Sequence, residues 1–197
     1  MSQSIYDKVI NHYVTRFILE PKLTKYLNNR NCATRKNMGI TYAIDLFKRE
    51  IEKFKKYEKF FFLKIDISKY FYTINHDVLK SNLINELDPD EYNLLCKIID
   101  STNKPYVDNI IYKLEKKHNL ILPKYDYNEG LPIGNLTSQF LAIFYLSKLQ
   151  HYILNDLHIT YVNFMDDYVL IHESKEYLKY SLDLIIEKIR KRIQTKN

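Results

Sequence analysis

The feature that most constrains this chain is a pair of adjacent acids, Asp166 and Asp167, placed between two short apolar runs. The runs, residues 160–163 and 169–171, are rich in the β-branched and aromatic residues that are typical of strands. Two acids at the tip of an otherwise apolar hairpin are unusual, because burying adjacent like charges is costly. The pair therefore predicts a hairpin with a functional site at its tip.

A third acid, Asp66, follows the aromatic run FFFLKI, and residues 60–67 have the composition of a buried strand. If this strand lies beside the Asp-Asp hairpin, three carboxylates meet at one edge of a sheet. Such a cluster needs a compensating cation, and oxygen ligands favour a hard divalent ion such as Mg²⁺. Two such ions, about 3.5–4 Å apart, activate an attacking hydroxyl and stabilise a leaving pyrophosphate. The three acids therefore predict nucleotidyl transfer.

Helical periodicity accounts for most of the remaining chain. Apolar spacing predicts helices over residues 4–19 (ended by Pro21), 41–56, 77–87, 90–99, 107–117, 135–155 (capped by Asn135) and 174–191. Because these helices flank a few short strands, we expect an α+β fold with a small antiparallel sheet.

The composition fits one soluble domain, or one domain with a large lobe, because 46% of the 197 residues are hydrophobic. A net charge of +6 favours a polyanionic partner. Two cysteines, Cys32 and Cys96, are too few for a disulfide framework or a cysteine zinc site. The first ten residues have no apolar signal core, and no apolar run approaches the ~18 residues of a membrane span. We therefore expect a cytoplasmic protein without a membrane partner.

Three motifs resemble the catalytic motifs of reverse transcriptases and occur in the same order. The run FMDD at residues 164–167 resembles their YMDD-type motif. The run KIDISKYFYTINH resembles their first catalytic motif, in which an acid, here Asp66, precedes an aromatic residue, here Phe71, by five positions. The run GLPIGNLTSQ resembles the motif at the turn before the palm helix. Each motif alone is weakly specific, but together they extend the resemblance over most of the chain.

The resemblance implies the fold of a right-hand polymerase, with a small antiparallel palm sheet packed on helices and a mostly helical fingers lobe. It divides the chain into the first part of the fingers (residues 1–59), the first catalytic strand of the palm (60–77), the fingers return and connecting loop (78–130), and the palm helix, Asp-Asp hairpin and last helix (131–197). The family continues into a basic, helical thumb, whereas this sequence stops about thirty residues after Asp167. We therefore expect the thumb to be absent, through truncation, degeneration or assembly from separate pieces.

The activity that the resemblance implies is RNA-directed DNA synthesis, in which a dNMP is transferred from a dNTP to the 3′-hydroxyl of a primer. The implied catalytic residues are Asp66, Asp166 and Asp167, and the implied metal ligands are Asp66, Ile67, Asp166 and Asp167. The cofactor would be two Mg²⁺ ions, with Mn²⁺ as an alternative. The implied partners are an RNA template, a DNA primer or RNA–DNA duplex, a dNTP, and an accessory protein or a separate thumb region.

Further residues are expected to bind substrate: Phe71, Arg35, Lys36, Ile133, Gly134 and Gln139. A ring at Phe71 that stacks under the sugar would clash with a 2′-hydroxyl, although simple core packing explains most aromatic residues. Ile133, Gly134 and Gln139 contact template or nucleotide in this interpretation, and the alternative is an ordinary helix start. Arg35 and Lys36 would bind the triphosphate, and the alternative is a solvated basic loop.

One variation indicates a branch within the family. An aliphatic residue, Ile133, followed by Gly-x-x-x-Ser-Gln resembles the error-prone bacterial enzymes of diversity-generating retroelements, and so does the run RNCATRKNMGITYAI. Two alternatives stay open. One is an untemplated or protein-primed polymerase of a bacterial phage-defence system, and the other is an inactive, thumbless remnant that only binds nucleic acid.

Overall fold

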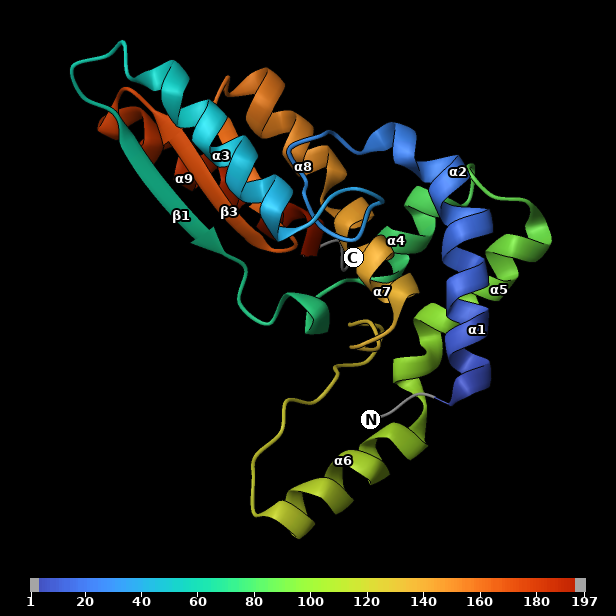
Figure 1. Ribbon diagram of the computed structural model, residues 1–197. Coiled ribbons are helices and arrows are strands. Elements are labelled where there is room, and N and C mark those ends of the chain that lie inside the picture. Colours follow the sequence, from blue (N-terminus) through green and yellow to red (C-terminus); the bar gives the residue numbers. More distant parts are fainter. Residues whose placement is uncertain (1–3, 194–197) are drawn as a thin grey trace. The chain divides into compact units, whose positions relative to one another are not determined.

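The computed structural model describes residues 4–193, which fall into two compact units (Figure 1). Unit 1 comprises the described residues up to Lys22 together with Lys69–Ala142. Unit 2 comprises Leu23–Ser68 and the described residues from Ile143 onwards. Each unit is described by itself. Both contain segments that are far apart in the sequence, so each depends on long-range contacts.

Unit 2 is built on a three-stranded antiparallel sheet with the strand order β1-β3-β2. The strands are β1 (Phe61–Asp66), β2 (Thr160–Phe164) and β3 (Asp167–His172). The small antiparallel sheet and its three predicted strands are thereby confirmed, but the prediction that the first strand is buried is wrong, because the residues of β1 alternate between half-buried and exposed. Because β3 lies in the centre, it is hydrogen-bonded both to β1, which ends at Asp66, and to β2, which leads into the Asp-Asp turn.

One face of this sheet is covered by α3 (Ile40–Phe54). Val162 on β2 is buried in a cluster with Leu46 of α3 and with Cys32. Nearer the other edge, the rings of Phe47 and Phe62 are 5.8 Å apart, measured between centroids. The apolar spacing predicted the helix but matches its buried face only in part, because Leu46 and Glu50 are its buried residues and Ile44 is 49% exposed.

The opposite face packs on α8 (Ser147–His151) and α9 (Lys175–Ile193). The buried Tyr168 accepts a hydrogen bond from Gln150 of α8, with 3.3 Å between Nε2 and the hydroxyl oxygen. The ring of Tyr177 on α9 lies 4.7 Å from the ring of His172. The sheet therefore has helices packed on both of its faces.

A basic loop over residues 28–39 is attached to the edge strand β2. The amide of Asn163 donates to the carbonyl of Arg30 at 3.0 Å, and the amide of Cys32 donates to the carbonyl of Asn163 at 2.9 Å. Burial raises the pKa of the Cys32 thiol to about 11, so this cysteine stays protonated and inert at neutral pH. The loop is therefore an extension of the sheet edge rather than a free segment.

Unit 1 is helical. Its helices are α1 (Ile5–Tyr13), α2 (Glu20–Leu23), α4 (His76–Leu83), α5 (Pro89–Ile99), α6 (Pro105–His118) and α7 (Leu136–Tyr145), and the ends of α2 and α7 extend into unit 2. The prediction that Pro21 ends the first helix is wrong, because the run continues through a π-helical turn (Val14–Leu19) into α2. Pro21 lies in the first turn of α2, where the missing N–H is tolerated.

The long helix predicted after Asn135 is present but interrupted. Asn135 caps it, since its Oδ1 accepts from the amide of Ser138 at 2.7 Å. Leu146, with a ψ of −5°, separates α7 from α8, and a π-helical turn (Tyr152–Asp156) follows. The cap is therefore confirmed, whereas the single continuous helix is not.

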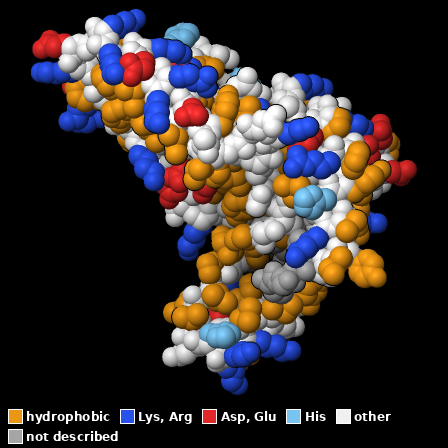
Figure 2. Space-filling view, viewed as in Figure 1, with side chains coloured by type: hydrophobic (Ala, Val, Ile, Leu, Met, Phe, Trp, Pro, Cys, Tyr) orange, Lys and Arg blue, Asp and Glu red, His pale blue; other side chains and the backbone are white. Residues whose placement is uncertain are grey.

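Several large apolar side chains of α1 and the turn after it remain at the surface: Ile5, Tyr6, Val9, Ile10, Tyr13 and Phe17. Figure 2 shows hydrophobic side chains over this helix. The spacing that predicted the helix therefore did not mark a core-facing stripe. Across residues 4–193, no helix combines the length and the apolar character needed to cross a membrane.

Candidate active site

The Asp-Asp motif lies in a two-residue turn between β2 and β3. Phe164 pairs with Asp167, which leaves Met165 and Asp166 as the central residues of the turn. Met165 has a φ of +57°, a region in which residues with a side chain are strained. The turn is held by Asn163, whose Nδ2 donates to the carbonyl of Met165 at 2.9 Å. A strained turn that is fixed by a buried amide is typical of a functional site.

Asp66 and Asp167 are directly opposite one another in the pairing of β1 with β3. Opposed residues of an antiparallel pair point to the same face, so both carboxylates lie on one side of the sheet, and both are exposed. The Nζ of Lys64 is 3.1 Å from Oδ1 of Asp167. Because both groups are exposed, this ion pair offsets only a small part of the repulsion between the acids.

Asp166 is half-buried, and burial raises the pKa of its carboxyl. The charges of Asp66 and Asp167 raise this pKa further, while a backbone hydrogen bond lowers it. The three predicted acids are thus brought together closely enough to influence one another. This is the electrostatic situation that a bound cation would relieve.

The donor set fits a hard divalent ion in its chemistry, because it consists of carboxylate oxygens. Within residues 4–193, however, no three His, Cys, Asp or Glu side chains are already grouped as a metal-ligand set. Ile67, the fourth predicted ligand, follows β1 and is half-buried. Metal binding at these residues therefore stays a prediction.

The predicted triphosphate-binding cations lie in the loop over residues 28–39. Arg35 donates to the carbonyls of Asn28, at 2.6 Å, and of Asn31, and burial lowers the pKa of its guanidinium. Arg30 donates to the carbonyl of Tyr161 at 2.9 Å and lies 3.3 Å from a carboxylate oxygen of the buried Glu50.

Through these contacts, Arg30 and Arg35 stabilise the conformation of the loop. Lys36, by contrast, is exposed to solvent. The roles of Arg35 and Lys36 in binding substrate stay predictions.

The remaining predicted substrate residues belong to unit 1. Phe71 lies in a short 3-10 turn (Tyr70–Tyr72), and its carbonyl accepts from the amide of Leu131 at 2.8 Å. Leu131 is the second residue of GLPIG and lies two residues before Ile133, so the structure places Phe71 beside the start of this turn. Ile133 is 52% exposed and Gly134 is also exposed, which leaves this turn accessible. Gln139 is half-buried on α7.

The contact between Phe71 and Leu131 depends on Gly130. This glycine has a φ of +85°, and a Cβ there would lie 2.5 Å from the ring of Tyr125 and 3.1 Å from the carbonyl oxygen of Phe71. A side chain would therefore force the two segments apart. Glycine is required here by both conformation and space.

Two buried polar residues with structural roles at these sites were not predicted as such. Asn163 orients the Asp-Asp turn, and its only sequence signal is a polar residue inside an apolar strand. His76 is the first residue of α4, after the cap Asn75. Its ring is also fully buried and contacts the carbonyl of Gly130. An isolated histidine gives no sequence signal for that contact.

Comparisons with known proteins agree with this architecture. The family model described as "Reverse transcriptase (RNA-dependent DNA polymerase)" matches residues 2–196. Among the solved structures that match is an apo telomerase from Candida tropicalis truncated from its C-terminal domain. The match has a TM-score of 0.56 and 14% sequence identity, and it covers 98% of this chain and 42% of the telomerase chain.

At this level of identity, the likeness to the telomerase shows the fold. The chain spans less than half the length of that telomerase chain. No curated protein matches the sequence.

Proposed function

The chain belongs to the reverse transcriptase family of RNA-dependent DNA polymerases, and we propose that it transfers dNMP from a dNTP to the 3′-hydroxyl of a primer on an RNA template. The observation that carries this proposal is the placement of Asp66 opposite Asp167, with Asp166 in the adjoining turn. Carboxylates from two strands then converge where the family places its chemistry. The fold and the family both support RNA-directed DNA synthesis, and this support does not depend on the residues of the basic loop over residues 28–39.

In this proposal Asp66, Asp166 and Asp167, with Ile67, form the place where Mg²⁺ binds, and Mn²⁺ can replace it. When bound, the ions supply activation of the primer hydroxyl and stabilise charge on the leaving pyrophosphate. Asp66 contributes its carboxylate from the end of β1, and Asp166 contributes its carboxylate from the turn between β2 and β3. Lys64 limits the repulsion from Asp167, to which it is paired.

Other residues would select and orient the nucleotide. The ring of Phe71 stacks under the sugar and excludes a 2′-hydroxyl, which makes the enzyme selective for deoxynucleotides. Gly134 allows the backbone to approach the nucleotide, since the space around its Cα is open. Arg35 and Lys36 attract the triphosphate, and Gln139 contacts the template or nucleotide.

The finer assignment is to the error-prone branch found in diversity-generating retroelements of bacteria. The supporting residue is Ile133, whose aliphatic side chain cannot donate a hydrogen bond to a template base or sugar. Looser positioning of the template would reduce discrimination between correct and incorrect nucleotides. An accessory protein or a separate thumb region completes the grip on the primer–template in this assignment.

The test is primer extension by the purified chain with Mg²⁺ and dNTPs on an RNA template, on a DNA template and without template. We expect product whose sequence complements the RNA template. Product that forms equally without template or primer would instead support an untemplated or protein-primed polymerase. Binding of primer–template without any extension, in Mg²⁺ and in Mn²⁺, would contradict the proposal and support a remnant that only binds nucleic acid.

A further inference from the structure

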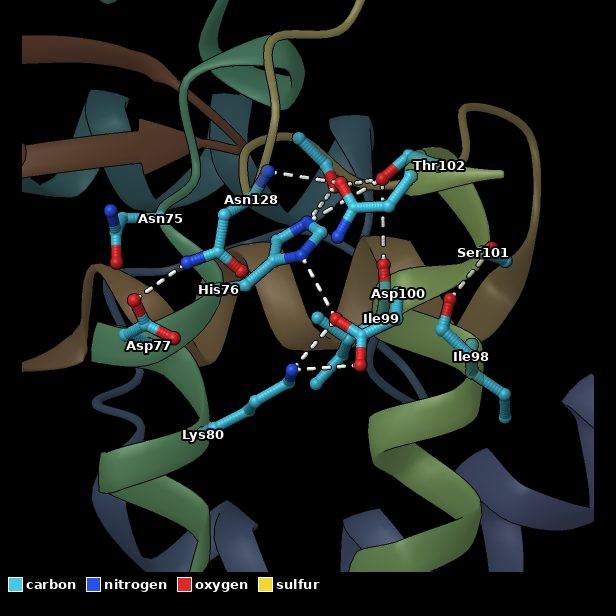
Figure 3. Close-up of polar contacts among 12 residues, drawn as sticks. Asn75, His76, Asp77, Lys80, Ile98, Ile99, Asp100, Ser101, Thr102 and Asn128 are labelled. Carbon is cyan, nitrogen blue, oxygen red and sulfur yellow. Dashed lines mark hydrogen bonds and ion pairs between the residues drawn. The ribbon is translucent and has the colours of Figure 1, made fainter. Parts of the chain in front are cut away.

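A buried polar network in unit 1 links α4, the end of α5 and Gly130, the first residue of the GLPIG turn (Figure 3). Its central residue is His76, whose side chain is fully buried. Figure 3 shows the ring between Asp100 and Thr102, with Lys80 reaching the same aspartate. A buried imidazole with several polar neighbours has a fixed orientation, so it can hold other groups in place.

The two ring nitrogens of His76 contact different segments. Nε2 is 2.6 Å from the carbonyl oxygen of Gly130, and because a carbonyl only accepts, Nε2 must donate this hydrogen bond. Nδ1 is 3.2 Å from Oδ1 of Asp100, which terminates α5. Lys80 binds both oxygens of Asp100, at 2.7 and 2.8 Å, and fixes that carboxylate in turn.

The carbonyl of Gly130 is therefore clamped from two directions. Besides His76, the hydroxyl of Thr102 donates to it at 3.1 Å. The amide of Leu131, which belongs to the same peptide group as this carbonyl, donates to the carbonyl of Phe71 at 2.8 Å. The amide of Gly130, in the preceding peptide group, donates to the carbonyl of Ile74 at 2.8 Å. A rotation of the Gly130 peptide would thus move Phe71 and the GLPIG turn relative to one another.

We infer that His76 is a positioning residue, which fixes the Gly130 peptide and so sets the spacing between Phe71 and the turn at Ile133 and Gly134. Phe71 and this turn carry nucleotide selection in the proposed function, and the inference rests on that proposal for its effect on activity. The consequence is that His76 controls dNTP binding and sugar discrimination without touching the nucleotide.

A matched pair of substitutions separates the two contacts of the ring. His76→Gln places an amide N–H near the position of Nε2 and retains a donor for Gly130. His76→Asn places its amide near the position of Nδ1, so it keeps the contact with Asp100 and loses the one with Gly130. The control is Ser81→Ala on the same helix, because the Ser81 hydroxyl is exposed and bonds only locally, to the carbonyl of Val78.

In primer extension, His76→Asn should raise the KM for dNTP about tenfold with kcat within about threefold, because the lost interaction positions the binding site rather than the reacting atoms. Its preference for dNTP over rNTP should fall by about the same factor. His76→Gln should stay within about threefold of the parent in both quantities. A purely structural role would lower kcat in both variants in proportion to their loss of melting temperature, with sugar preference unchanged.

Hydrogen exchange gives a readout that does not require activity. In His76→Asn, the amides of Gly130 and Leu131 should exchange about tenfold faster, and in His76→Gln at the parent rate. Asp100→Ala, at a partly exposed position, releases Nδ1 and should accelerate the same amides to a smaller extent, which keeps the test available if His76→Asn does not fold.

The outcomes separate the inference from the proposed function. Unchanged exchange at Gly130 and Leu131 in His76→Asn and Asp100→Ala, or equal losses in the Asn and Gln variants, would overturn the positioning role. A parent chain that extends no primer, while exchange follows the expected pattern, would overturn the proposed function and the nucleotide effect and leave the positioning role standing.

Discussion

Asp66 of β1 is the direct register partner of Asp167 of β3, so two acids that are about a hundred residues apart in the sequence face the same side of one sheet. The pairing adds a third acid, because Asp166 is the neighbour of Asp167 in the turn. Negative charges on neighbouring carboxylates repel one another and disfavour the folded state unless a cation or a proton compensates them. The arrangement is therefore retained at a cost to stability, which is characteristic of functional sites.

Because the clustered acids lower the stability of the fold, we expect Asp166→Asn to raise it. Burial and the neighbouring acids raise the pKa of Asp166, so the folded chain binds this proton more readily than the unfolded chain. Unfolding free energy then falls as pH rises from about 4 through the raised pKa. Asn carries no charge, so the metal-free variant should melt about 1–3 °C higher than the parent at pH 7.

Calorimetry between pH 4 and pH 7 checks this expectation. The difference between variant and parent should shrink as the pH is lowered towards 4, because the parent carboxyl becomes neutral. A variant that melts lower than the parent at pH 7, or a difference that does not vary with pH, would show that Asp166 is not destabilised by its surroundings.

Phe71→Val should admit ribonucleotides. The substitution removes the ring but leaves the backbone carbonyl that accepts from Leu131, so the local fold should persist. We expect the preference for dNTP over rNTP to fall by about tenfold or more, as when a steric contact in a binding pocket is lost. The measurement is steady-state incorporation of both nucleotides, with Tyr72→Val as the neighbouring control. An unchanged preference would assign Phe71 to packing.

Ile133→Gln should raise fidelity. Ile133 is 52% exposed, so a polar side chain of similar length is tolerated and can donate a hydrogen bond to template or nucleotide. Each kcal/mol or so of added discrimination reduces errors about fivefold to tenfold. Sequencing the products of both enzymes on one RNA template measures the effect. Equal error rates would remove the argument for an error-prone assignment.

Gly130→Ala should destabilise the fold, whereas Gly39→Ala should not. A Cβ at Gly130 meets the Tyr125 ring at 2.5 Å and requires a strained φ of +85°. We expect a loss of about 2–3 kcal/mol in unfolding free energy. At Gly39 no atom lies within 4 Å of the added Cβ, and the backbone is extended, so the change should be within about 0.5 kcal/mol. Urea unfolding of both variants compares the two sites.

The strands and most helices could be predicted because their patterns are local. Residues 60–67 could be predicted as a strand because aromatic and β-branched side chains fit a packed sheet. The two runs on either side of the Asp-Asp pair could be predicted for the same reason. The resemblance to reverse transcriptases then implied that this strand and the Asp-Asp hairpin belong to one small palm sheet. Apolar spacing also predicted α3, although it marked the face buried on β2 only in part, because Ile44 is 49% exposed.

What could not be predicted depends on contacts between distant residues. Asn163 and His76 are polar residues whose roles appear only when a turn and a carbonyl are brought against them. Pro21 was misleading because a preceding π-helical turn places it in the first turn of a new helix. The exposed apolar side chains of α1 have the same spacing as a buried stripe, and periodicity alone cannot tell which surface a helix buries.

The central claim is that Asp66 and Asp166 carry templated DNA synthesis. The most direct measurement is primer extension on an RNA template by the parent chain, Asp66→Asn and Asp166→Asn, with Asp45→Asn on the exposed side of α3 as the charge-matched control. Circular dichroism of each variant confirms that it is folded. We expect extension by the parent and the control, and a loss of at least about a hundredfold in both site variants, because they no longer stabilise the charge of the transition state. Extension at the parent rate by a folded Asp66→Asn or Asp166→Asn protein would contradict the account.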